Sequence, residues 1–174
     1  MTRPARIILA AVTLYLSWMA MMAVHESGHV LATLLGGGHV RRVVIPLMDF
    51  SRTDVAPNPS PALEVWGGPL WGSVLPLVVW FAVRKGLSKP FATGLGFFTG
   101  LCLIANGCYL DMGWTMTAGD AAQLIKLGTP IWLLALFGVA TVMLGLYIWH
   151  SLGRFTNLFA PSKDRANSTP HPPV

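Results

Sequence analysis

Two histidines and a glutamate stand close together in the segment AVHESGHVLA, residues 23–32. His25 and His29 are four residues apart, so on a helix they lie on one face and both imidazoles can bind a single zinc ion. Glu26, beside the first histidine, can then take a proton from a zinc-bound water. Zinc lowers the pKa of that water to about 7 and polarises a carbonyl group. These residue types at this spacing predict metal-assisted hydrolysis, such as that of a peptide bond.

The segment lies at the end of a long apolar stretch, where ionisable groups are costly to bury. Uncharged residues run from Ile7 to Val24 directly before it. A polar cluster at membrane depth indicates a functional site, because its burial has to be compensated by a partner, a metal or water. The alternative interpretation is a solvated helix end with incidental histidines.

The composition of the whole chain is that of a membrane protein. Only 11% of its 174 residues are charged and 53% are hydrophobic, with a mean hydropathy of +0.58, whereas soluble domains carry about 25% charged residues. The net charge of +5 does not indicate nucleic-acid binding, because no basic run with interleaved aromatic residues occurs. Lys and Arg instead lie near the ends of apolar segments, where they set topology and contact anionic lipid headgroups. The expected partners therefore include the lipid bilayer and exclude nucleic acid.

Four apolar segments are each long enough to cross the hydrocarbon core of a bilayer as a helix. We expect helices over about residues 7–35, 65–83, 91–110 and 131–152. The first is longer than the hydrophobic part of a signal peptide and no A-x-A-like cleavage site follows it, so we expect it to be retained. The sequence therefore predicts an all-α, multi-pass integral membrane protein, which we place in the plasma membrane.

The segments between and after these helices differ in character. Residues 37–64 are polar and contain HVRRVVIPLMDF, whose β-branched stretch Val40–Ile45 predicts a short strand or hairpin after the first helix. Residues 160–174 are rich in Pro, Ser and charge, which is typical of disorder. We expect one membrane-embedded domain over residues 1–159 and a disordered tail after it.

Three motifs together resemble the site-2 protease class of intramembrane zinc metalloproteases. They are HESGH in a membrane helix, GGPLWGS opening the next helix, and AGDAAQLIKLGTP after a third. The likeness covers residues 19–130. It implies a core of three helices, zinc held by two histidines and an aspartate, and cleavage of membrane-spanning protein substrates. Larger members of the class carry a PDZ domain, and this chain resembles the minimal, core-only members.

A catalytic zinc ion has three protein ligands and one open position, so a third ligand is needed besides the two histidines. The metzincin pattern is excluded, because it requires a histidine at the position of Leu35. Asp49 and Asp54 are loop acids that we expect to be solvated. Glu64 is expected in a polar loop before a helix, which makes it a poor ligand. Two later aspartates remain.

The choice between these two aspartates depends on the resemblance. The class has an asparagine followed by an aspartate in an LDG-like motif, and ANGCYLD provides Asn106 and Asp111 in that order, with Met112 in place of the glycine. AGDAAQL provides Asp120, as in the short core-only members. We expect Asp120 to be the ligand in preference to Asp111; its alternative role is to cap a helix over residues 121–127. Asn106 is expected to hold the oxyanion or the substrate backbone, or else to make an interhelical hydrogen bond.

The leading interpretation is an intramembrane zinc endopeptidase that cleaves transmembrane segments of membrane protein substrates. Its predicted site has one zinc ion on His25, His29 and Asp120, with Glu26 and Asn106 as the catalytic residues. The alternative is a catalytically silent membrane protein that binds zinc or handles metal ions. Glu26 favours hydrolysis, because hydrolysis needs a base at that position and a silent protein does not.

The positive charges also predict an orientation in the membrane. With four spans, eight of the 12 Lys and Arg residues lie on the side of the termini, and they are Arg3, Arg6, Arg84, Lys85, Lys89, Arg154, Lys163 and Arg165. The other four are Arg41, Arg42, Arg52 and Lys126. The positive-inside rule therefore places both termini in the cytoplasm. The resemblance implies the reverse, because zinc sites of the class usually lie nearer the cytoplasmic face.

Overall fold

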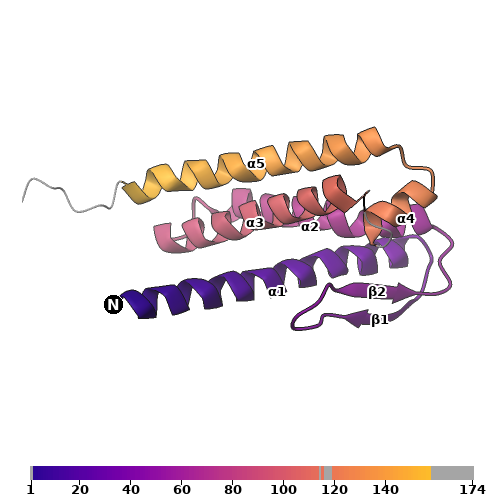
Figure 1. Cartoon of the computed structure of the whole chain (residues 1–174), viewed down its shortest axis with the longest axis horizontal. Helices are drawn as coiled ribbons and strands as arrows, with labels where there is room; N and C mark the ends of the chain where they lie inside the picture. The colour runs from indigo at the N-terminus through magenta and orange to yellow at the C-terminus, as the bar shows by residue number, and fades with distance from the viewer. Residues whose placement is uncertain (1, 114, 116–118, 158–174) are drawn as a thin grey trace, which may run out of the picture.

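The computed structural model describes residues 2–113, 115 and 119–157. Within these residues the chain forms five helices and a two-stranded sheet (Figure 1). In chain order the elements are α1 (Arg3–Leu35), β1 (Val40–Val44), β2 (Arg52–Val55), α2 (Pro61–Val83), α3 (Lys89–Gly113), α4 (Asp120–Lys126) and α5 (Ile131–Asn157). The predicted fold class, mostly helical with four long apolar helices and a hairpin after the first, is confirmed. The tail predicted to be disordered lies outside the described residues.

Four helical segments are long and apolar enough to cross a membrane, namely Arg3–Leu35, Pro61–Val83, Lys89–Gly113 and Ile131–Gly153. The first three begin earlier than their apolar runs predict, and each has a proline as its first or second residue. Proline is favourable there, because the N–H groups of the first turn have no partner within the helix and the fixed φ suits a helix. The end of α1 at Leu35, directly before three glycines, agrees with the prediction.

The long helices run alternately in opposite directions, so α1 and α3 point one way and α2 and α5 the other (Figure 1). α2 packs against both α1 and α3, and α3 packs against α5. α4 and the hairpin lie at the end of the bundle where α1 ends and α2 begins (Figure 1). At this end, residues of short elements therefore come close to residues of the long helices.

Glycines let neighbouring helices approach closely. A Cβ on Gly67 of α2 would lie 2.5 Å from Ala32 Cβ and 2.6 Å from the carbonyl oxygen of Gly28, both in α1. A Cβ on Gly107 of α3 would lie 2.8 Å from the carbonyl oxygen of Gly138 in α5. Small residues at helix interfaces allow such close packing in lipid. The tight contact between α1 and α2 brings the first turns of α2 to the level of the histidines.

Apolar side chains cover the outside of the long helices, while polar side chains lie inside. Every side chain over residues 7–16 of α1 is exposed. Among the residues that the structure describes, the buried polar and charged ones are His25, Glu26, His29, Thr33, Glu64, Ser73, Thr99, Asn106 and Asp120. Three clusters of apolar residues are buried as well in the described part of the chain, so the difference from a water-soluble protein lies in the apolar outer surface. This surface fits helices that are surrounded by lipid.

The hairpin folds back along α1. β1 and β2 are antiparallel, with Val43 opposite Thr53. The connection between the strands reaches Tyr15, whose hydroxyl donates a hydrogen bond to the Leu47 carbonyl oxygen at 3.2 Å. Tyr15 stands well before the end of α1 at residue 35, a distance of about 30 Å along the helix axis. The hairpin therefore lies beside a large part of α1, including the turn that carries Glu26.

Candidate metal centre

His25, His29 and Asp120 bring three ligand atoms together at the end of the bundle. His25 Nε2 lies 3.0 Å from His29 Nε2. Asp120 Oδ2 lies 3.1 Å from His25 Nε2 and 3.4 Å from His29 Nε2. None of the three residues is more than 9% exposed. Together they could hold a metal ion.

The distances suit a tetrahedral zinc ion. When ligand atoms lie about 2.0–2.2 Å from the ion, tetrahedral geometry separates them by about 3.3–3.6 Å. The observed separations of 3.0–3.4 Å are close to this range and somewhat shorter. Two imidazoles and one carboxylate also form a donor set of catalytic zinc sites, which keep a fourth position open. The residues therefore fit zinc, and the same donor types bind other divalent metals as well.

Both histidines are oriented by an acceptor at Nδ1. His25 Nδ1 lies 2.6 Å from Asn106 Oδ1, and Asn106 Nδ2 donates to the Cys102 carbonyl oxygen at 2.8 Å, which fixes the amide. His29 Nδ1 lies 2.9 Å from the carbonyl oxygen of Glu64 and 3.2 Å from Glu64 Oε1. Acceptors at Nδ1 favour the tautomer with its proton there. The lone pairs of both Nε2 atoms are then available to a metal.

Two glycines of the GGPLWGS motif make room for this arrangement. A Cβ on Gly68 would collide with His29 Nε2 and would lie 2.7 Å from His25 Nε2. A Cβ on Gly72 would lie 2.8 Å from Nδ2 and 2.9 Å from Oδ1 of Asn106. The motif therefore has a physical function in this chain. It lets the imidazoles and the amide pack directly on the backbone of α2.

Asp120, and not Asp111, lies beside the histidines. α4 begins at Asp120, but its N-cap residue is Gly119 and no side chain caps the helix, so the alternative role of Asp120 as a cap is wrong. The Asp111 side chain instead packs against Gly138 of α5. Burial alone would raise the pKa of the Asp120 carboxyl. When no metal is bound, the hydrogen bonds that the histidine Nε2–H groups donate to Asp120 outweigh this effect and lower the pKa to about 2. The carboxylate is therefore ionised at neutral pH, as a metal ligand must be. A metal ion would take the place of these Nε2 protons.

Glu26 lies next to the first ligand without belonging to the ligand group. Its side chain is buried, with 2% exposed. Its Oε2 accepts a hydrogen bond from Thr53 Oγ1 at 2.6 Å. A carboxylate that is adjacent to the ligands, but is not one of them, is what a general base of this type requires.

The expectation for Glu64 was wrong. The sequence predicts Glu64 in a polar loop, but it lies in the first turn of α2 and is only 8% exposed. The reason is that Pro61 starts the helix before the apolar pattern begins. The other two excluded acids lie away from the ligand group, since Asp49 is exposed and Asp54 pairs with Arg42 at 2.7 Å.

Glu64 could have been found by helix spacing. Glu64, Gly68 and Gly72 follow one another at intervals of four residues, so they share one face of α2. An acid in line with two glycines indicates a face that packs closely against polar groups. Once the start of the helix is known, this pattern predicts that Glu64 points to the site.

Two more residues at the site were not predicted from the sequence. The Tyr109 hydroxyl accepts a hydrogen bond from the backbone N–H of Asp120 at 3.3 Å, and its ring lies edge-on to His25 at 6.0 Å. Thr53 contacts Glu26 only because the hairpin folds back along α1. No local spacing rule marks either residue, because each contact joins elements that are distant in the chain.

The fold and the site define a helical protein with four helices that are apolar enough to span a membrane and a buried His–His–Asp group that could hold a metal ion. Comparisons of the chain with protein-family models, with curated proteins and with solved structures give no match. The chemistry of the site is therefore the feature that indicates a function.

Proposed function

We propose that the protein is an intramembrane zinc endopeptidase of the site-2 protease class, which cleaves transmembrane segments of other membrane proteins. The observation that carries this proposal is the buried convergence of His25, His29 and Asp120, with the buried Glu26 next to His25 in the chain. This set contains the three ligands and the base of a zinc hydrolase. α1, which carries three of these residues, is apolar enough to span a membrane.

Each residue has its own role in the proposed reaction. His25, His29 and Asp120 hold the ion, which when bound polarises the substrate carbonyl and lowers the pKa of a water molecule. Glu26 would accept one proton of the attacking water, whose oxygen bonds to the carbonyl carbon, and would pass this proton to the amine that leaves as the C–N bond breaks. Asn106 orients His25 through its amide oxygen. The catalytic role of Asn106 stays a prediction. One N–H of its amide donates to the Cys102 carbonyl oxygen, and the second N–H would be the one to hold the oxyanion or the substrate backbone.

A transmembrane segment is the substrate class that the position of the site favours. Two ligands lie on a helix that the bilayer would surround, so the peptide bond has to reach them from within or beside the membrane. Peptide bonds in a helix are shielded, because their carbonyl groups accept hydrogen bonds. The substrate therefore has to unwind locally before attack. The plasma membrane as the location, and the termini in the cytoplasm, stay predictions from the sequence.

The alternative function is metal binding or metal handling without hydrolysis. The same three ligands serve both functions, so the base distinguishes between them. A carboxylate buried as deeply as that of Glu26 is costly unless it is paired or used. This cost favours hydrolysis.

Cleavage of transmembrane peptides by the purified protein tests the proposal. In detergent, the wild type should cleave members of a panel of such peptides, while Glu26→Gln should bind the same amount of zinc and cleave none of them. Asp49→Asn removes a carboxylate that is exposed and is the matched control; it should change neither property. Zinc binding by the wild type without cleavage of any peptide would favour the metal-handling alternative.

A further inference from the structure

The hairpin reaches the site through one side chain. The Thr53 hydroxyl, on β2, donates a hydrogen bond to Glu26 Oε2 at 2.6 Å. We propose that Thr53 is the positioning residue of the general base, and that the hairpin thereby sets the position of the Glu26 carboxylate. The inference rests on the proposed function of Glu26. The contact itself can be tested without any activity.

The Glu26 carboxylate depends on this hydrogen bond for its orientation. Because the residue is 2% exposed, bulk water has little access to replace a lost partner. Among the described residues, Thr53 is the donor that contacts the carboxylate. Hydrogen bonds to a charged group are stronger than those between neutral groups. Since the bond uses Oε2, Oε1 remains to accept a proton, so Thr53 can fix the base without blocking it.

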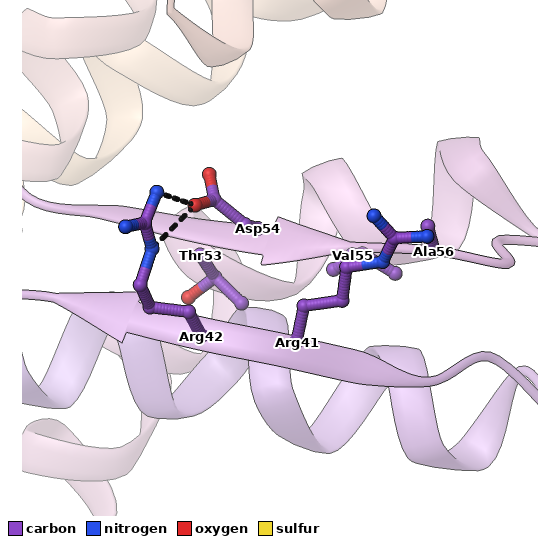
Figure 2. A pocket seen from close by; sticks show the side chains of 6 residues that line it. All are labelled: Arg41, Arg42, Thr53, Asp54, Val55 and Ala56. Atoms are coloured by element: carbon purple, nitrogen blue, oxygen red, sulfur yellow. Dashed lines mark hydrogen bonds and ion pairs between the residues drawn. The ribbon is translucent and has the colours of Figure 1, made fainter.

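The register of the hairpin turns Thr53 toward α1. Side chains alternate between the two faces of a strand, so Thr53 points opposite to its neighbours Arg52 and Asp54. On the other face Asp54 accepts two hydrogen bonds from Arg42 of β1, at 2.9 and 2.7 Å (Figure 2). A slip by one residue would turn Thr53 away and bring a charged side chain against α1. The cross-strand ion pair therefore helps to keep the hydroxyl at Glu26.

Aromatic contacts fix the hairpin at a second place. The Phe50 ring, just before β2, lies edge-on to Trp18 of α1 at 6.4 Å and stacks on Tyr109 of α3 at 6.3 Å. Aromatic pairs at such distances stabilise a contact beyond the area they bury. The strand that carries Thr53 is thus held to two long helices close to the site. A displacement of the hairpin would move Thr53 away from Glu26.

Thr53 also lines an open cavity on the hairpin. The cavity has a volume of about 540 Å³, and Arg41, Arg42 and Val55 contribute to its wall (Figure 2). The Arg42–Asp54 ion pair belongs to this wall, whereas the Thr53 hydroxyl is turned to Glu26.

The isosteric substitution Thr53→Val removes the hydroxyl and keeps the shape of the side chain. In the zinc-loaded protein it should lower kcat by about 10- to 100-fold, with KM and zinc content close to the wild type. Thr53→Ser should restore most of the rate. Thr13→Val makes the same chemical change at an exposed position of α1 and should have no effect. Zinc loss in Thr53→Val, or equal rates for the valine and serine variants, would overturn the proposal.

Hydrogen–deuterium exchange of the metal-free protein tests the contact independently of activity. The amides of residues 40–55 should exchange faster in Thr53→Val than in the wild type or in Thr53→Ser, because the hydroxyl ties β2 to α1. In a Glu26→Ala background, Thr53→Val should have no further effect. Equal exchange in the wild type and both Thr53 variants contradicts the proposal. If the wild type cleaves no peptide, the proposed function fails, and this exchange pattern still decides whether Thr53 holds Glu26.

Discussion

The site consists of two halves that are built in different ways. In one half, His25 and His29 on α1 and Glu64 on α2 are placed by long helices that pack closely. In the other half, Asp120 and Thr53 lie on short elements, α4 and β2. The positions of the first set follow from helix spacing. The positions of the second set depend on how two connecting segments fold back onto the bundle.

The contrast is clearest for α4. With seven residues it is too short to be stable alone, so tertiary packing has to hold it. Ala121 and Leu124 are buried against Val65, Leu110 and Leu134 of three long helices. The carboxylate of Asp120 is therefore placed by apolar contacts one and four residues further along the chain. The helical half defines where a metal can bind, and the packing of short elements completes the site.

Loss of a histidine should have the largest effect. His25→Ala and His29→Ala each remove one of two imidazoles on the same helix face, so each should abolish zinc binding and cleavage. Metal analysis of the detergent-purified proteins, with the wild type expected to hold about one zinc per chain, measures this. Equal zinc in the wild type and both variants would show that the site is assigned wrongly.

The second-largest effect is expected for the loss of Asp120, the proposed third ligand. Asp120→Ala removes a ligand atom and should weaken zinc binding by more than about 100-fold, beyond the usual effect of losing a residue that only orients a ligand. Asp111→Ala is the matched control, because Asp111 faces α5 and should keep its zinc. Competition with a zinc chelator gives both affinities. The opposite result for the two variants would transfer the ligand role to Asp111 and would mean that α4 docks differently.

The same contrast explains what could be predicted from the sequence. The shared face of His25 and His29 is predictable, because helix periodicity is a local property. The choice between Asp120 and Asp111 needed the resemblance, since no local rule says how α4 packs. For Glu64 the sequence predicts a loop, because the apolar pattern starts after it, whereas α2 begins at Pro61. The contact of Thr53 joins residues that are distant in the chain, and only the folded hairpin brings them together.

A smaller effect is expected for Glu64, which orients a ligand without binding the metal. Glu64→Gln keeps the backbone carbonyl at His29 Nδ1 and changes the carboxylate contacts with His29 Nδ1 and Asn58 Nδ2. We therefore expect zinc affinity to fall by about 10-fold, at the low end for such residues. The chelator competition used for Asp120 measures it, with Asp49→Asn as the control at an exposed acid. An affinity as low as that of Asp120→Ala would mean that Glu64 contributes more than orientation.

The smallest effect is expected for the ion pair on the outer face of the hairpin. Arg42 donates hydrogen bonds to Asp54 and lowers the pKa of its carboxyl below the ordinary value of 3.8. Because the pKa is lowered on folding, the ion pair stabilises the folded hairpin fully at pH values above the ordinary pKa of 3.8. This contribution is lost as the pH falls through the lowered pKa. Because the pair is largely exposed, the contribution should be small.

Asp54→Asn tests this contribution and separates it from that of Thr53. In the metal-free protein near neutral pH, the amides of residues 40–55 should be slightly less protected from hydrogen exchange in Asp54→Asn than in the wild type, after correction for intrinsic rates. At a pH below the lowered pKa, where the wild-type carboxyl is also protonated, the difference should disappear. The loss should stay well below that in Thr53→Val. A loss of equal size would mean that the outer ion pair stabilises the hairpin as much as the contact with Glu26 does.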